Sequence, residues 1–210
     1  MARHREQASR PKLLKLRAVL AGGLVVGIGV TVTLASWVDR EFGSASFTAS
    51  TFDTESTSAA TSTGWASNAS APGAALTFNA TAMSPGTLQY ATLNVRTTAG
   101  TSVPGTIVLT SATTTGTLPA VLEYRLVRTA TTSTACNAAA FTGSTYIAGA
   151  ATPTYLAPTT VPGVAVSSTL AAAGGEIRYC FEVRMQTTAA TSYQGATGTI
   201  TWQFAATSDY

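Results

Sequence analysis

Apolar and polar residues alternate strictly over residues 176–185, which is the clearest structural pattern in the chain. The odd positions hold Ile177, Tyr179, Phe181, Val183 and Met185, whereas charged residues and a cysteine take the even ones. Successive side chains of a β-strand point to opposite faces, so this pattern predicts a strand with one face in a core. Arg178 and Glu182, on either side of Cys180, are typical of a solvated face.

Shorter alternating stretches recur along the rest of the chain. Strands are predicted over residues 74–80, 87–97, 106–110, 121–128 and 199–205, with a loop over residues 55–72. Near Ala91 the apolar residues switch from even to odd positions, from Leu88 and Tyr90 to Leu93 and Val95. This switch predicts a β-bulge or a crossing between sheets. Eight or nine short strands with turn residues at intervals of about ten indicate an all-β fold, a two-sheet antiparallel sandwich of jelly-roll type.

The N-terminus has a different pattern. Basic residues precede an apolar run over residues 18–35 that ends in small side chains. This is typical of a signal peptide, residues 1–35, which signal peptidase would cut between Ala35 and Ser36. The alternative is an uncleaved membrane anchor. In either case the basic end stays in the cytoplasm, and the rest of the chain lies outside.

Residues 36–53 follow the predicted cut as an N-terminal extension, and residues 54–210 form the predicted sandwich domain. The extension carries four aromatic residues among small polar ones: Trp37, Phe42, Phe47 and Phe52. Its end favours an extended strand, with Phe52 on the opposite face from Phe47. We expect this strand to leave its own domain and complete a sheet in a neighbouring subunit. The alternative is an ordinary first strand of the sandwich.

The segment from the apolar run to residue 53 resembles the start of the TasA and camelysin family of exported matrix-fibre proteins. The similarity rests on a glycine-rich apolar run, the Thr33-x-Ala35 cut, Trp37 with nearby Asp39, and the Phe47 strand; Ser50 stands where the family often has glycine. The resemblance implies a secreted subunit that polymerises with copies of itself. Its product would be a cell-surface or biofilm-matrix filament of a Gram-positive-type bacterium, exported through a SipW-type signal peptidase.

The net charge of +3 is a property of the predicted signal peptide. Residues 1–35 contain six of the twelve Lys and Arg and one of the nine acidic residues, which leaves the remainder at −2. The basic charge that a nucleic-acid partner would need is therefore missing. Both lysines, Lys12 and Lys15, lie in this segment, so lysine isopeptide crosslinks are excluded and polymerisation would be non-covalent. A low-charge surface suits self-association, although an exported domain without assembly has the same composition.

Cys136 and Cys180 are the two cysteines of the chain. In an exported protein they predict a disulfide, which closes a loop of about 44 residues and contributes roughly 3–4 kcal/mol. The alternative is a pair of free thiols. Because Cys180 lies on the polar face of its strand, the bridge would hold the threonine-rich loop, residues 129–145, across the outside of the sheet.

The sequence offers little for catalysis. The only histidine, His4, lies in the predicted signal peptide, which excludes histidine-dependent triads and zinc sites. Glu123, Glu176 and Glu182 alternate with core residues beside arginines, as on solvated strands. We therefore expect no enzyme activity, metal or cofactor. The rival functions are a monomeric adhesin or carbohydrate-binding module, with Trp65 and Tyr155 as exposed platforms, and a secreted hydrolase of the camelysin kind.

Overall fold

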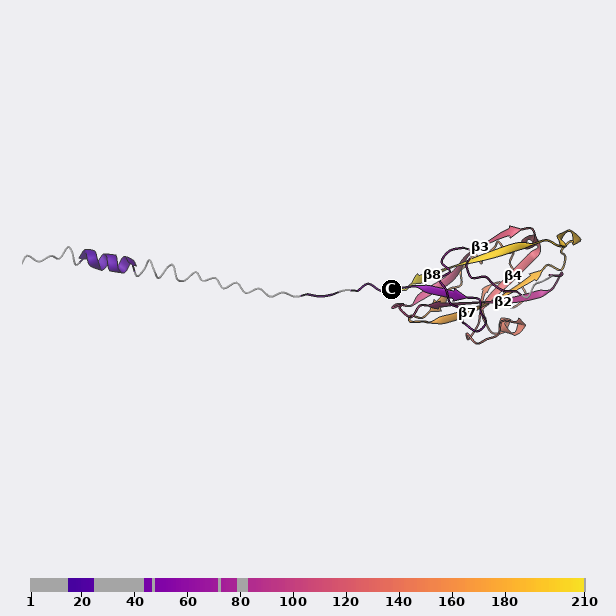
Figure 1. Ribbon diagram of the computed structural model, residues 1–210, viewed down its shortest axis with the longest axis horizontal. Helices are drawn as coiled ribbons and strands as arrows, with labels where there is room; N and C mark the ends of the chain where they lie inside the picture. The colour runs from indigo at the N-terminus through magenta and orange to yellow at the C-terminus, as the bar shows by residue number, and fades with distance from the viewer. Residues whose placement is uncertain (1–14, 25–43, 47, 72, 79–82, 210) are drawn as a thin grey trace, which may run out of the picture. The chain divides into compact units, whose positions relative to one another are not determined.

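The computed structural model describes residues 15–24, 44–46, 48–71, 73–78 and 83–209 (Figure 1). The chain divides into two compact units, Met1–Phe47 and Thr48–Tyr210, which are described separately. In the first unit residues 15–24 are helical. Among the described residues, no helix is both long enough and apolar enough to cross a membrane. The predicted cut between Ala35 and Ser36 and the residues Trp37, Phe42 and Phe47 lie outside the described residues.

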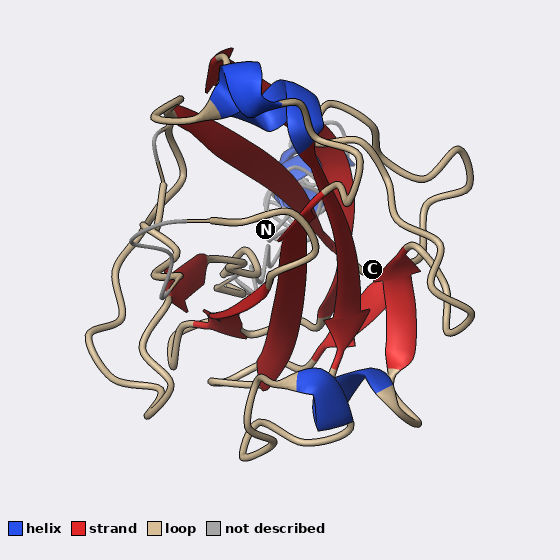
Figure 2. Ribbon diagram, turned by 90° about the vertical axis from the view of Figure 1, so that its right-hand side faces the viewer, coloured by secondary structure: helices blue, strands red, loops and turns tan. Residues whose placement is uncertain are grey.

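The described part of the second unit contains two antiparallel sheets. The larger sheet has the order β1 (Thr54–Thr57), β2 (Leu88–Thr97), β7 (Glu176–Met185), β4 (Leu122–Arg128) and β5 (Thr145–Ala148). The smaller sheet has the order β6 (Ser168–Leu170), β3 (Gly105–Gly116) and β8 (Gly198–Ser208). Figure 2 shows these strands with long loops around them. The predicted all-β two-sheet antiparallel sandwich is confirmed.

β7 is the central strand of the larger sheet and has the bounds that its alternation predicts. Its odd-numbered residues join one hydrophobic core with residues of β2, β3 and β4. Aromatic contacts connect the two sheets: Tyr179 stacks on Phe204 of β8 with 4.9 Å between ring centroids, and Phe181 lies 4.6 Å from Trp202. The strand with the clearest sequence pattern is therefore the one around which the core is built.

Three other predicted strands are confirmed as β3, β4 and β8, although β3 and β8 are longer than predicted. Short 3₁₀ turns lie at Leu118–Val121 before β4, at Ala138–Phe141 in the threonine-rich loop, and at Thr191–Tyr193 before β8. The first turn explains why β4 begins one residue later than predicted, because Val121 is still part of the turn.

The bulge predicted near Ala91 is absent, because β2 pairs with β7 in unbroken register. The change of parity has another cause. Leu93 and Val95 face the core between the sheets, whereas Tyr90 faces the opposite side and packs against Phe141 of the threonine-rich loop. Since both faces of β2 are covered, apolar residues occur on both, and the alternation changes without an inserted residue.

Two predicted assignments near the start of the second unit are wrong, the loop over residues 55–72 and the strand over residues 74–80. β1 falls mostly in the segment predicted as a loop; residues 48–53 are not in a strand within this chain, and their predicted pairing with another subunit stays a prediction. The composition of β1 is polar, but it pairs with β2 and is tied to it by an ion pair of 2.8 Å between Glu55 and Arg96. The described residues of the strand predicted over residues 74–80 are also not a strand. Whether these segments form strands depends on pairing with a neighbouring strand rather than on their local composition.

Candidate functional site

The free edge of β8 is the first feature of the candidate site. β8 has 11 residues and pairs with β3 along one side, and among the described strands its other side has no partner. Its inward side chains are only half-buried; they are Ile200, Trp202, Phe204 and Ala206. A long edge strand with unpaired backbone groups is a template for pairing with another chain.

A groove of about 1430 Å³ runs along this edge. Leu93 and Val95 of β2 and residues of β7 line one side, and β8 lines the other. The groove has a simple origin: the larger sheet has five strands and the smaller one has three, so part of the inner face of the larger sheet has no strand above it. We call this feature the β8 groove.

Loops cover the β8 groove in place of a strand. Residues 67–71, 73–78 and 83–85 lie along it from one loop, and residues 189–197 from another. Among the described lining residues, the ionisable side chains are Asp53, Glu55 and Tyr193, and the remainder are apolar or neutral and polar. The groove therefore suits an uncharged segment with apolar side chains better than a charged substrate.

Phe52, which the sequence predicts as part of a donor strand, packs in its own domain. A Cβ atom added to Gly105 would lie 2.5 Å from the Phe52 ring, so the ring sits directly on this glycine. The preceding residue is also bound: the Thr51 N–H donates to Ser102 Oγ at 2.9 Å, and its carbonyl accepts from the Ser102 N–H at 3.0 Å. Within one chain, residues 51–52 are thus an attachment point. Trp37, Phe42 and Phe47 stay predictions.

Trp65 and Tyr155, the platforms of the adhesin interpretation, are half-buried rather than exposed. The Arg96 guanidinium lies 4.3 Å from the Trp65 ring centroid, and the Arg184 guanidinium lies 3.7 Å from that of Tyr155. Cation–π contacts of this kind occupy one face of each ring. Each ring is therefore less available for stacking on a sugar than the fully exposed platform that the adhesin interpretation expects.

The predicted disulfide between Cys136 and Cys180 is confirmed, with 5.3 Å between the Cα atoms. Cys180 is completely buried, and it packs with Val127 of β4 and with Phe141 of the loop that carries Cys136. The bridge therefore holds the threonine-rich loop against the outer face of the larger sheet, as expected.

Glu182 was predicted to be solvated, but it is fully buried on this outer face. Arg125 donates to its two oxygens at 2.6 and 3.0 Å, and the Tyr155 hydroxyl donates to Oε1 at 2.5 Å. The loops that cover the sheet exclude water from this face, which alternation in the sequence does not reveal. Sequence reasoning missed this cluster, although the disulfide at Cys180 implies a covering loop over its neighbours.

The protonation states in this cluster are fixed near neutral pH. Burial alone would raise the pKa of the Glu182 carboxyl, but the hydrogen bonds from Arg125 and Tyr155 outweigh it and lower the pKa. Burial and the nearby carboxylate raise the pKa of Tyr155 to about 12, and that of Tyr90 to about 12 as well. A carboxylate that stays ionised near neutral pH between protonated tyrosines is suited to holding loops in place and poorly suited to proton transfer.

Arg178, also predicted to be solvated, is buried and binds two loops. Its Nε donates to Asn94 Oδ1 at 2.7 Å, Nη1 to the Thr134 carbonyl at 3.0 Å and Nη2 to the Ala60 carbonyl at 2.7 Å. Burial lowers the pKa of this guanidinium. The Ser62 hydroxyl connects it to Glu176: it accepts from Arg178 Nη2 at 3.2 Å and donates to Glu176 Oε1 at 2.6 Å. Arg178 therefore anchors loops rather than a ligand.

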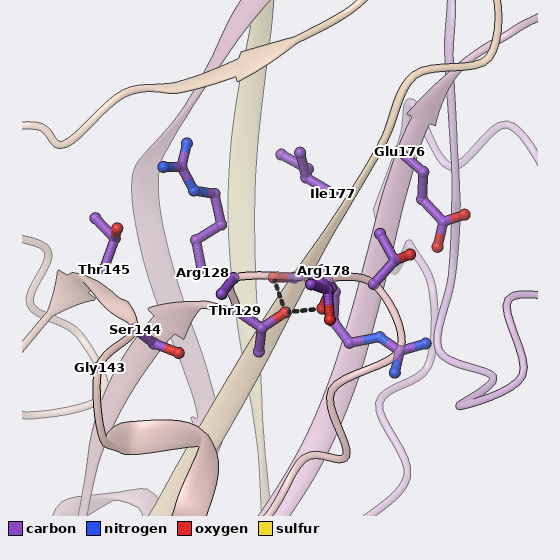
Figure 3. A pocket seen from close by; sticks show the side chains of 11 residues that line it. Arg128, Thr129, Gly143, Ser144, Thr145, Glu176, Ile177 and Arg178 are labelled. Carbon is purple, nitrogen blue, oxygen red and sulfur yellow. Dashed lines mark hydrogen bonds between the residues drawn. The ribbon is translucent and has the colours of Figure 1, made fainter.

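A small hollow of about 300 Å³ lies at the same end of β4 and β7. Figure 3 shows Thr129 at its centre, where the hydroxyl donates to the Thr131 and Arg178 carbonyls at 2.8 and 3.3 Å. Arg128 and Glu176 lie on opposite sides of Thr129 in this view. The hydroxyl is already used within the protein, and no nucleophile and base converge here.

The remaining acidic strand residue, Glu123, pairs with Arg184 at 2.5 Å. Among the described residues, no group of three or more His, Cys, Asp or Glu side chains could hold a metal ion. No family model matches the chain, and no curated protein matches it either. The β8 groove is therefore the feature on which a functional hypothesis rests.

Proposed function

We propose that this protein is an exported structural subunit that polymerises non-covalently into extracellular filaments. In this mechanism a segment of one subunit enters the β8 groove of the next and adds a strand to its smaller sheet. The observation that carries the proposal is the free edge of β8 beside an incompletely filled core. Backbone hydrogen bonds to such an edge supply affinity, and side-chain pockets supply the register.

The N-terminal extension has the length that this role requires. The attachment of Thr51 and Phe52 to their own domain limits the donor segment to residues 36–50. Eleven residues of antiparallel strand span about 37 Å, so the segment can pair along all of β8 and still leave about four residues as a linker. The described residues among 44–50 are exposed and are not in a strand, so pairing with β8 would not break a strand of their own.

The chemistry of the two partners is also compatible. The segment brings Trp37, Phe42 and Phe47 among small polar residues, and the groove presents apolar side chains with few charges. A contact between one end of a subunit and a different surface of the next does not close on itself, so it generates filaments. The resemblance to exported matrix-fibre proteins supports a filament of the cell surface or biofilm matrix of a Gram-positive-type bacterium.

Electron microscopy of purified protein tests this function. A chain that begins at Ser36 is expected to form filaments, and a chain that begins at Thr48 is expected to stay monomeric. Phe47→Ser in the longer chain should reduce filament formation, whereas Thr48→Ser, a matched conservative change beside it, should not. Filaments from the shorter chain, or monomers from both, would refute assembly by strand addition.

A further inference from the structure

Two hydrogen bonds show which residues of β8 turn their backbone groups toward β3. The Gln203 carbonyl accepts from the Thr110 hydroxyl of β3 at 3.1 Å, and the Asp209 N–H, directly after β8, donates to the Pro104 carbonyl at 2.9 Å. Successive residues of a strand turn their N–H and C=O groups to alternate sides. Thr110 is the extra residue where the β3–β8 register shifts, so β8 itself is regular. The odd-numbered residues of β8 therefore bond toward β3 along the whole strand.

The even-numbered residues of β8 consequently present their N–H and C=O groups at the free edge. They include the four residues whose side chains face the groove: Ile200, Trp202, Phe204 and Ala206. In an antiparallel pair, two residues that exchange both backbone hydrogen bonds lie directly opposite each other, with their side chains on the same face of the sheet. An incoming antiparallel strand must therefore turn into the β8 groove the side chains of the residues that bond to this edge.

The uncharged end of the donor segment matches this requirement. Over residues 43–50 the even positions hold only serine and threonine, and the odd positions hold Gly43, Ala45, Phe47 and Ala49. With the odd positions turned inward, apolar side chains enter the groove and hydroxyls join the outer face of the smaller sheet. The strands of that sheet have the same character, because β3, β6 and β8 are rich in threonine and contain no charged residue.

The charged end of the donor segment does not match. If the same alternation continued over residues 37–42, it would turn Asp39 and Glu41 into the groove. The described lining residues include the acids Asp53 and Glu55 but no basic side chain. Two further carboxylates would lose water there without gaining a cation, which is costly. Pairing with β8 should therefore stop near residue 43.

We propose that residues 43–49 are the strand that adds to β8, with Gly43, Ala45, Phe47 and Ala49 in the groove and residues 37–42 outside the sheet. The inference rests on the proposed strand-addition function and specifies the segment that enters and the face that it buries. Ser50 alone then joins the paired strand to the attachment at Thr51. The linker is thus shorter than the length of the extension would allow, and successive subunits lie in direct contact.

The test uses residues 48–210, which form a compact unit with its own core and disulfide, and labelled synthetic peptides of residues 36–50. Fluorescence anisotropy measures the dissociation constant of each peptide. Ala45→Asp places a carboxylate in the groove and should weaken binding by at least about tenfold. Ser46→Asp, the same charge at the neighbouring outward position, should change the dissociation constant by less than about threefold.

Amide hydrogen exchange, followed by NMR, locates the contact independently of any substitution. Saturating unaltered peptide should protect the amides of the four groove-facing residues of β8, whereas those of Gln203 and Ala205 are already protected by β3 and should not change. If these four amides are protected but Ser46→Asp weakens binding as much as Ala45→Asp or more, the assigned face is wrong and strand addition stands. If their exchange stays unchanged, strand addition is overturned, and the inference with it.

Discussion

Replacing Arg125 with methionine tests whether the buried ion pair holds the outer layer of the domain in place. Arg125 and Glu182 face each other on β4 and β7, and their side chains are 12% and 0% exposed. Methionine keeps much of the aliphatic volume of Arg125 but leaves the Glu182 carboxylate buried with Tyr155 as its remaining partner. An uncompensated buried charge of this kind costs about 3–5 kcal/mol of unfolding free energy.

A neighbouring pair in the same ladder provides the control. Glu123 and Arg184 also face each other across β4 and β7, but their side chains are 20% and 29% exposed. Solvent-exposed pairs contribute about 0–1 kcal/mol, and this pair lies between that limit and the buried one, so Glu123→Gln should lower the unfolding free energy by clearly less than Arg125→Met does. Because the two pairs have the same cross-strand arrangement, a difference between the two losses of stability reports the effect of burial.

Urea unfolding at pH 7, followed by tryptophan fluorescence, measures both effects. The double variant Arg125→Met with Glu182→Leu removes both charges, so it should be more stable than the sum of the two single losses predicts, by at least about 2 kcal/mol. Additive losses, or equal losses for Arg125→Met and Glu123→Gln, would refute the assignment of the pair as a buried, mutually dependent unit.

Three further predictions concern pH, redox state and packing. The folded-state pKa of Glu182 is lowered, so the ionised carboxylate makes the native protein more stable than Glu182→Gln. This difference in unfolding free energy should be complete above the unfolded-state pKa near 4.5 and disappear as the pH falls through the lower folded-state pKa. Urea titrations from pH 7 to pH 2 measure the difference, and a difference that grows in acid would contradict the prediction. Serine at both disulfide cysteines should cost about 3–4 kcal/mol of unfolding free energy, and an unchanged urea midpoint would contradict this. Gly105→Ala should displace Phe52 and raise the rate of proteolysis at residues 48–53, because the new Cβ would meet the ring and a β8 carbonyl at 2.5 Å. Gly163→Ala, which adds a Cβ in open space, should leave this rate unchanged. Equal proteolysis of the two variants would show the contact to be unimportant.

The fold was predictable from the sequence wherever a strand has one face in the core and only that face is apolar. The apolar positions of β7 gave its bounds, and the parity of Ile107, Leu122 and Trp202 identified the inward faces of β3, β4 and β8. The two sheets and the disulfide followed from these strands and from Cys136 and Cys180. Local alternation is sufficient here because burial on one face leaves a period of two.

The outer face of the larger sheet could not be read in the same way. Arg178 and Glu182 have the alternation of a solvated surface, yet loops from distant parts of the chain cover them. Polar side chains that pair with one another leave the same sequence pattern as polar side chains that face water. The β8 groove was equally invisible, because the number of strands in each sheet and the absence of a partner for β8 depend on long-range pairing.

The attachment of the extension at Thr51 and Phe52 has a mechanical consequence. A pull on the chain before Thr51 enters the domain at the turn between β2 and β3, where Thr51 is bonded to Ser102, and at the Phe52 ring, which sits on Gly105 at the start of β3. The load therefore reaches β3, the strand that is hydrogen-bonded to β8 over most of its length. If the segment of the next subunit pairs with β8 as proposed, the load that enters and the load that leaves the domain act on two neighbouring, hydrogen-bonded strands.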